Sequence, residues 1–457
     1  MTRRADRITN AVVAAALCCL GVLPGCARYQ AQPLDPAASA RSLQTRSLDD
    51  PDLRHFVSVN LRRTPVRWDL AGLTAAAAYE RPDTRIAMGQ IQAAEAGERT
   101  ATEWPNPVLS LNASYYAALF EPSPWEVGPS ISQLIQTAGK RSAAIAEAQA
   151  RTHSARQQLA LAAWQLRSQV RTALIELWTA RQRLALARAY NDAAHRVTML
   201  TSERYDVGAV SAAALTTQRL IDTQAAIDLT AAERQEHLAA ASLAAAVGVP
   251  VAAIEPAAID LSEMDRLAPL PDLDALRLSA LTQRPEVLDA LARYEAAEAA
   301  LRLEVARQYP DLNIGPGYQY NQGQHQFSLG ISLPLPILNQ NQGPIAAARA
   351  ARQVAAADFD KVQTTVLGEV ETALTDWRAS QQEARRTRGM LRLADETVRS
   401  ETAAFHAGQI GRLQLAGAEL ARAQTAIGAL AARADERTAL GHLEDAFHHP
   451  FIGVKEK

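Results

Sequence analysis

An internal duplication constrains the fold of this chain more than any other feature of its sequence. Arg81-Pro82-Asp83 returns 203 residues later as Arg284-Pro285-Glu286, and Tyr205-Asp206-Val207-Gly208 returns 200 residues later as Phe405-His406-Ala407-Gly408. The slow drift of the spacing indicates one structural unit that occurs twice, with a few small deletions. Each half is therefore predicted to contain a helix, a strand hairpin, a long helix, a turn and another helix.

Two segments at matching places in the halves predict strand hairpins. Residues 107–136 and 309–336 alternate apolar and polar side chains with a period of two. The first segment turns at Glu121-Pro122-Ser123-Pro124, and the second turns at Asn321-Gln322-Gly323. Such alternation is typical of strands with one apolar face, and runs of about ten residues are long enough to cross a bilayer. Four strands cannot close into a barrel, and open sheet edges do not survive in lipid. The remaining strands must come from other copies of the chain.

Long helices follow from a period near 3.6. Residues 142–205 contain no Pro or Gly and would form a helix roughly 95 Å long at 1.5 Å per residue. Its apolar stripe recurs in the second half: Leu166, Val170, Ala173, Leu174 and Leu177 match Val366, Val370, Ala373, Leu374 and Trp377. A stripe of this length requires packing against other helices along its whole extent.

Shorter helices are predicted to stack end to end beside each long one. In the first half these are residues 83–104 and 212–247, and in the second half 286–308 and 412–447, beside a long helix over 345–406. Gly208 and Gly408 stand in the turns, where a positive φ is expected.

The N-terminus reads as a secretory signal over residues 1–25, with arginines before the apolar run 11–23. It resembles a bacterial lipoprotein signal, in which Cys26 becomes the lipidated first residue of the mature chain. Cleavage without lipid is the alternative. Residues 26–70 are predicted to be a tether, or an extended arm on a neighbouring molecule. The remaining divisions are a first repeat over 71–250, a linker across the helical mid-section over 251–271, a second repeat over 272–450 and a tail over 451–457.

Several classes of function find no support in the sequence. A net charge of -2 and the absence of a basic patch give no argument for nucleic acid. No phosphate-binding loop and no nucleophile with its base is present, so neither enzymatic activity nor a cofactor is expected. His448-His449 lacks companion ligands and is expected to be a mobile polar tail rather than a metal site. Trp164, Trp178 and Trp377 are expected to pack in the core, and Trp104 and Trp125 to form an interfacial girdle.

With these features the chain resembles the TolC-like outer-membrane factor family over nearly its whole mature length. The resemblance is carried by the duplicated Arg-Pro-Asp/Glu helix starts, the paired hairpins and the Tyr/Phe-x-x-Gly turns. Gly139-Lys140-Arg141, Pro334-Leu335-Pro336 and Asn341-Gln342-Gly343 are similar to its heavy-metal efflux, CzcC-like branch. The resemblance implies a mainly α protein with membrane β-strands: a homotrimer with a twelve-stranded β-barrel in outer-membrane lipid and a tunnel of twelve helices in the periplasm.

The resemblance also implies a gate where the helices converge on the periplasmic side. In some members aspartates beyond the second turn ring the entrance, but the matching positions here are Gln414 and Gly417. An acidic cation-binding ring is therefore not expected, and the hypothesis is that Arg412 lines or locks the entrance. The alternative is a solvated charge on the helix face. The gate candidates are Gly208, Gly408, Arg412, Gln414 and Glu419.

The expected function is a passive exit duct of a tripartite efflux system. The resemblance implies two partners, an inner-membrane pump of the resistance-nodulation-division (RND) type and a periplasmic adaptor, or membrane fusion protein. Metal cations or small toxic compounds are the expected substrates. Two alternatives remain: an outer-membrane channel for type I protein secretion, and a periplasmic adaptor or structural coiled-coil lipoprotein. The last would not need two strand hairpins.

Overall fold

The computed structural model describes residues 28–63, 67–116, 125–266, 270–321 and 324–452. The predicted signal and Cys26 lie outside these ranges, as do the turn at 121–124 and most of the 451–457 tail. The described chain consists of two units that divide after Thr45. In the first unit, helix α2 (Pro36–Gln44) begins at Asp35, whose carboxylate accepts a hydrogen bond of 2.9 Å from the amide of Ala37.

The second unit, from Arg46 onward, contains the two predicted repeats. Helix α3 (Pro51–Leu61) precedes the first repeat, which comprises α4 (Leu70–Glu80), α5 (Pro82–Thr102), β1 (Val108–Tyr115), β2 (Trp125–Ile135), α6 (Lys140–Asp206) and α7 (Ala212–Val247). The connection holds α8 (Val251–Ile254) and the 3-10 turn η1 (Ser262–Asp265). The second repeat comprises α9 (Leu273–Gln283), α10 (Pro285–Ala306), β3 (Leu312–Asn321), β4 (Gln324–Ser332), α11 (Gln342–His406) and α12 (Arg412–Phe447). The predicted order of elements is confirmed.

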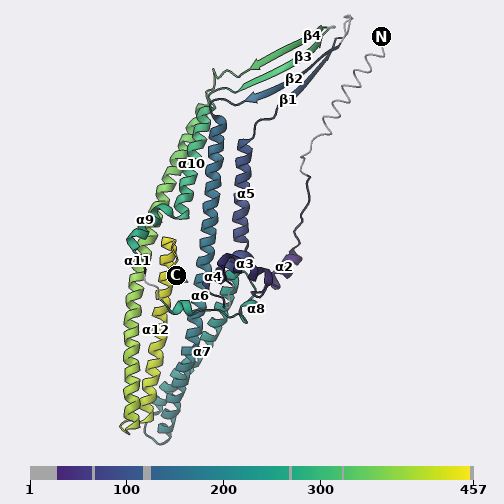
Figure 1. Cartoon of the computed structure of the whole chain (residues 1–457). Helices are drawn as coiled ribbons and strands as arrows, with labels where there is room; N and C mark the ends of the chain where they lie inside the picture. Colours follow the sequence, from purple (N-terminus) through teal and green to yellow (C-terminus); the bar gives the residue numbers. More distant parts are fainter. Residues whose placement is uncertain (1–27, 64–66, 117–124, 267–269, 322–323, 453–457) are drawn as a thin grey trace. The chain divides into compact units, whose positions relative to one another are not determined.

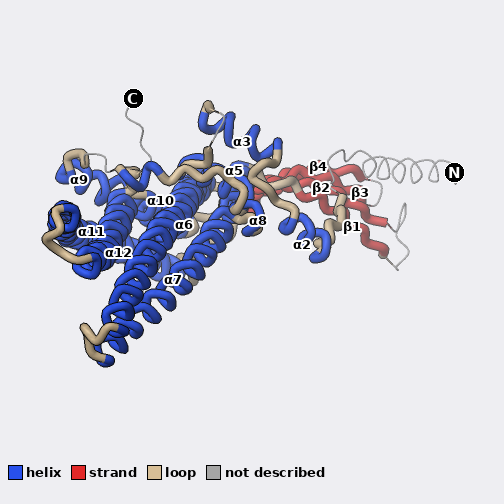
Figure 2. The backbone as a smooth tube through the Cα atoms, turned by 90° about the horizontal axis from the view of Figure 1, so that it is seen from below, coloured by secondary structure: helices blue, strands red, loops and turns tan. Residues whose placement is uncertain are grey.

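The short helices lie end to end beside the long ones, as predicted. In Figure 1, α5 and α7 follow one another along α6, and α10 and α12 follow one another along α11, while α10 and α12 also contact α6. An arginine joins each pair. Arg81 donates to the carbonyl of Ala246 at 3.4 Å, and Arg284 donates to the carbonyl of Ala446 at 3.1 Å. Figure 2 shows the same helices from below, with the strands at one end.

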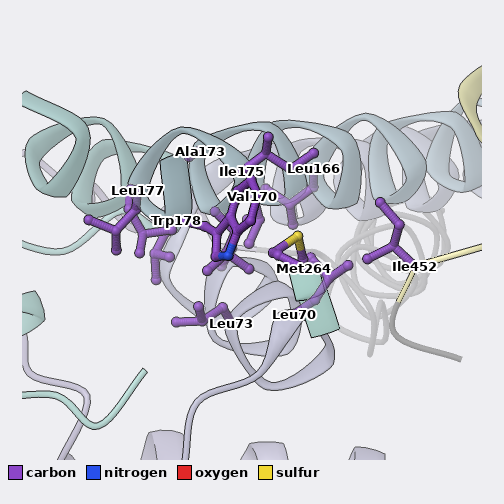
Figure 3. Packing of buried hydrophobic residues seen from close by; sticks show 14 of the residues in the cluster. Leu70, Leu73, Leu166, Val170, Ala173, Ile175, Leu177, Trp178, Met264 and Ile452 are labelled. Carbon is purple, nitrogen blue, oxygen red and sulfur yellow. The ribbon is translucent and has the colours of Figure 1, made fainter. Parts of the chain in front are cut away.

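One hydrophobic core lies at mid-height of the long helices. Figure 3 shows Leu166, Val170 and Trp178 of α6 facing Leu70 of α4 and Met264 of the connection, and all five side chains are buried. The connection after Pro250 is held by a parallel bridge between Ile259 and Trp68. The predicted stripe of α6 is thus covered within the chain at this level, where α4 and the connection lie against it.

The expectation of a tether or extended arm up to residue 70 is wrong for its second part. Leu53 and Val57 are fully buried in the core, and α3 forms around them. Arg46 also pairs with Glu80 at 2.9 Å and donates to the carbonyl of Gly248 at 2.7 Å. The missed signal was an Asp50 cap followed by a proline, which is a usual helix start.

The C-terminal histidines are not a mobile tail. The side chain of His448 is only 9% exposed and stacks on Trp164, with 4.7 Å between ring centres, and its Nε2 lies 3.2 Å from Glu286 Oε1. The following Phe451 and Ile452 are also buried, and their amides donate to the carboxylate of Glu444. Contacts with side chains far away in the sequence therefore fix this segment.

Candidate functional site

The strands form one antiparallel sheet in the order β1-β2-β3-β4 within the described residues. The middle pair joins the repeats, with Val127 opposite Tyr320 and Ser130 opposite Gly317. Neither β1 nor β4 has a second strand partner in the described part of the chain. The sheet therefore ends on both sides in open edges, whose backbone groups are available for pairing.

One face of the sheet is mainly apolar, with Gln133 and His325 as polar members. Directly opposed residues point to the same face, so the register defines this surface. It carries the pairs Leu109–Ile131, Leu111–Pro129, Ala113–Val127, Tyr115–Trp125, Ile314–Ile331, Pro316–Leu329 and Tyr318–Phe327. Most of the large side chains among them are exposed, and Phe327 is 85% exposed. An apolar surface of this extent calls for lipid or protein to cover it.

The other face carries mainly small or polar side chains. One row runs across all four strands as Ser110, Ser130, Gly317 and Ser328. A Cβ on Gly317 would lie 2.9 Å from Ser328 Oγ, so a larger side chain there requires the Ser328 hydroxyl to move. Strands that face lipid on one side and a water-filled interior on the other show this alternation.

No helix in the described ranges is both long enough and apolar enough to cross a membrane.

The junction between sheet and helices explains the Gly139-Lys140-Arg141 motif. Gly139, the last residue of the short connection 136–139, has a φ of 75° and lets the chain turn into α6. The buried Lys140 donates to the carbonyl of Tyr309 and to Asp311 Oδ1, both at 2.6 Å. Arg141 lies over the ring of Trp104 at 4.7 Å. The motif therefore binds the first repeat to the point where β3 begins in the second.

The gate candidates lie at the opposite end of the long helices. Gly208 and Gly408 have φ values of 74° and 73°, which confirms the predicted left-handed turns. Between the end of α6 and the start of α12 lies a cavity of about 390 Å³, and both Arg412 and Glu419 line it. Glu419 Oε2 accepts a hydrogen bond of 3.0 Å from Arg196.

Gln414 is not among the residues that line this cavity. Its amide donates to the carboxylate of Glu401 at 2.9 Å and thereby ties α12 to α11. Sequence reasoning missed Arg196, which lies 223 residues from Glu419. A contact between such distant positions leaves no local pattern in the sequence.

A larger cavity of about 840 Å³ lies where α10 and α12 meet beside α6 and α11. Its lining includes Trp164, Arg284, Glu286, Asp445 and His448. Burial alone would raise the pKa of Glu286, but hydrogen bonds from His448 and Arg284 outweigh it and hold this pKa at about 2. The carboxylate therefore remains charged at neutral pH.

The first repeat forms a simpler version of this cavity, of about 410 Å³, around Arg81, Gln169 and Ser242. The residue equivalent to His448 is Gly248, with a φ of 87°. His448 adopts the same left-handed conformation, with a φ of 48°. Since a side chain is strained there, its ring stack and its contact with Glu286 offset a local cost.

Within the described residues no group of three or more His, Cys, Asp or Glu side chains could hold a metal ion. Similarity to known proteins adds information about the family to which this site belongs. A family model described as "Outer membrane efflux protein" matches residues 73–249 and 276–447.

Among individual proteins, the cobalt-zinc-cadmium resistance protein CzcC of Cupriavidus metallidurans is 26% identical over 340 residues, which cover 72% of this chain and 78% of CzcC. The outer membrane protein VceC of Vibrio cholerae has a similar fold, with a TM-score of 0.67, 19% identity and coverage of 84% of this chain and 96% of VceC. CusC gives a TM-score of 0.68, with 17% identity and coverage of 84% and 93%.

Proposed function

Since the chain belongs to the outer membrane efflux protein family, we propose that three copies of it form the passive exit duct of a tripartite efflux system. The duct receives its substrate from an inner-membrane pump of the RND type through a periplasmic adaptor. The pump supplies the energy, and the duct supplies a continuous path to the outside.

The sheet is the observation that carries this proposal. It has one apolar face, one small polar face and two open edges. In lipid, each unpaired backbone group costs several kcal/mol, so the edges must be paired. Three copies would place twelve strands in one closed barrel, with the apolar face toward lipid and the polar face toward the lumen.

The proposed substrates are metal cations or small toxic compounds. The support is the relationship to CzcC, whose name assigns it to cobalt, zinc and cadmium resistance. A passive duct needs no tight metal site, because an ion that binds tightly leaves slowly. Lipid attached to Cys26 would add an anchor in the outer membrane.

The alternatives from the sequence find less support. A periplasmic adaptor or structural coiled-coil lipoprotein would not need a sheet with an apolar face and two open edges. A channel for type I protein secretion would share the fold, but no observation on this chain favours a protein substrate.

Growth under toxic stress tests the proposal. Deletion of the gene is expected to lower the tolerated concentration of cobalt, zinc or cadmium salts, or of small organic toxicants, and the intact gene is expected to restore it. Accumulation of the same metal in the cells, measured by elemental analysis, separates export from other forms of protection. Unchanged tolerance and accumulation for every toxicant would contradict a role in efflux.

A further inference from the structure

The cavity of about 840 Å³ at the junction of α10 and α12 has an uncharged side and a charged side. Helix α6 lines it with uncharged side chains, among them Leu161 and Trp164. Helix α11 lines it with Glu369 and Asp376, which lie seven residues apart and therefore on one face of the helix, about two turns from each other. A molecule inside the cavity would contact both kinds of surface.

The charges of the cavity lining do not balance. The lining includes one guanidinium, that of Arg284, and four carboxylates, those of Glu286, Glu369, Asp376 and Asp445. Arg171, which lies behind the lining, pairs with Asp445 at 2.6 Å. Even with this pair, the carboxylates outnumber the guanidinium groups that face them. The cavity therefore has an excess of negative charge.

Two of the four carboxylates remain accessible to a ligand. The side chains of Glu369 and Asp376 are each 48% exposed. Glu369 shares the guanidinium of Arg284 with Glu286, and Asp376 Oδ2 lies 3.6 Å from His442 Nδ1, which is beyond hydrogen-bond distance. Both carboxylates can therefore accept a further positive group.

The equivalent cavity of the first repeat shows that the fold does not require this charge. The residues 200 positions before Glu369, His442 and Asp445 are Gln169, Ser242 and Ala245. Among the described residues that line the first cavity, Arg81 and Glu176 are the charged ones, and their formal charges cancel. The second repeat thus carries excess charge at a junction that the first repeat forms without it.

We infer that the cavity at the junction of α10 and α12 is a binding site for an apolar organic cation. The positive group of the ligand lies beside Glu369 and Asp376, and its apolar body lies along Leu161 and Trp164. Cavities of several hundred Å³ that combine apolar side chains with a few polar groups are typical of small-molecule sites. A single metal ion does not suit the cavity, because no three described His, Cys, Asp or Glu side chains come together to hold one.

This inference goes beyond the proposed duct and does not rest on it. The lining residues all belong to one chain, so the site does not depend on a second copy. A ligand there would contact α6, α10, α11 and α12 together. Because a ligand that binds only the folded protein stabilises it, an organic cation is expected to raise the unfolding temperature.

Removal of the two accessible charges tests the preference for a cation. Ethidium, a fluorescent aromatic cation, serves as the probe, and its anisotropy reports binding to the purified protein in detergent. The double variant Glu369→Gln, Asp376→Asn is expected to weaken this binding about fivefold or more, because it removes both charge pairs with little change in shape. Glu176→Gln, at the position equivalent to Asp376, is expected to leave the affinity unchanged. Equal affinity of the double variant and the wild type would overturn the inference.

A substitution that fills the cavity tests the location of the ligand. Gly368 of α11 lines the cavity, and a Cβ there would meet no atom within 4 Å. Gly368→Leu is expected to weaken ethidium binding, because the new side chain occupies space that the ligand needs. Gly389→Leu is the control, since Gly389 lies in the same helix with equally open space and does not line this cavity. Equal binding by all variants would place ethidium in the micelle and overturn the site.

The two substitutions together define the chemistry of the site. Weaker binding in Gly368→Leu with unchanged binding in the double variant would show a cavity without preference for cations, which contradicts the inference. A conducting trimer that does not bind ethidium would overturn the site and leave the proposed duct intact. A protein that binds ethidium in this cavity but forms no channel would remove the duct and leave the site intact.

Discussion

Arg171 of α6 and Glu444 of α12 form a buried ion pair, with 2.7 Å between Nη1 and Oε2. Arg171 also contacts Asp445 at 2.6 Å, and Glu444 accepts the amides of the C-terminal segment. The residue equivalent to Glu444 in the first repeat is Ala244. The buried charge pair therefore joins α12 of the second repeat to α6 of the first, and the equivalent position of Glu444 in α7 carries no charge.

Glu444→Ala is expected to destabilise the protein by about 3–5 kcal/mol, because it removes the buried partner of Arg171, leaving Asp445, and the acceptor of the Phe451 and Ile452 amides. The double variant Arg171→Met, Glu444→Leu is expected to recover most of the loss, since well-packed apolar side chains can replace a buried pair. Thermal unfolding in detergent measures both. A single variant as stable as the wild type would contradict the importance of the pair.

Gly441→Ala is expected to cost about 1–3 kcal/mol, the usual cost of overpacking a core. A Cβ at this position would lie 2.8 Å from Nε of the buried Arg171. Gly428 in the same helix provides the control, because nothing lies within 4 Å of its added Cβ. Gly428→Ala is expected to raise the unfolding temperature slightly, since alanine favours helix more than glycine does.

Acid is expected to weaken the junction of α10 and α12. The pKa of Glu286 lies at about 2, below the usual 4.5, because hydrogen bonds from His448 and Arg284 outweigh its burial. A lowered pKa contributes stability that is present above about pH 4.5 and is lost as the pH falls toward 2, and the full contribution is on the order of 3 kcal/mol. Glu286→Gln should therefore remove part of the loss of stability over this range.

The repeat equivalent of Glu286 gives the control for that titration. The pKa of Asp83 is also lowered, chiefly by its hydrogen bond from Arg81, but its side chain is 44% exposed, so solvent screens the pair. Asp83→Asn is expected to change the acid unfolding curve less than Glu286→Gln. The opposite order would show that the contacts of His448 do not set the acid response.

At the tip, Arg412→Ala is expected to raise the single-channel conductance if Arg412 lines or locks the entrance. The residue starts α12 and lines the same cavity as Glu419. Arg151→Ala serves as the control, because within the described residues Arg151 pairs with Glu147 of its own helix. Equal conductance of the Arg412→Ala channel and the wild type would make the solvated-charge alternative correct.

Local sequence determined most of the architecture. Residues 142–205 lack Pro and Gly, so α6 could be predicted to within two residues of its observed bounds, and the bounds of α7 and α12 coincide with the prediction. The alternation in the hairpins likewise predicted both faces of the sheet. These features depend on neighbours along the chain, which a single sequence displays.

The features that could not be predicted depend on residues brought together by folding. The ion pair of Arg171 with Glu444 spans 273 residues, and the contact of Arg196 with Glu419 spans 223. His448 was predicted to belong to a polar tail, because nothing nearby in the sequence indicates its contacts with Trp164 and Glu286. The start of α3 at Asp50-Pro51 was visible in the sequence, but the burial of Leu53 and Val57 depends on the core that they join after folding.

The most direct test of the account is planar-bilayer conductance of the purified protein, with its native mass measured on the same preparation. The account predicts a trimer that gives discrete pore openings, because three copies of the open-edged sheet close around a polar interior. A monomer that shows no conductance, with or without the Arg412→Ala substitution, would contradict the shared barrel and with it the proposed exit duct.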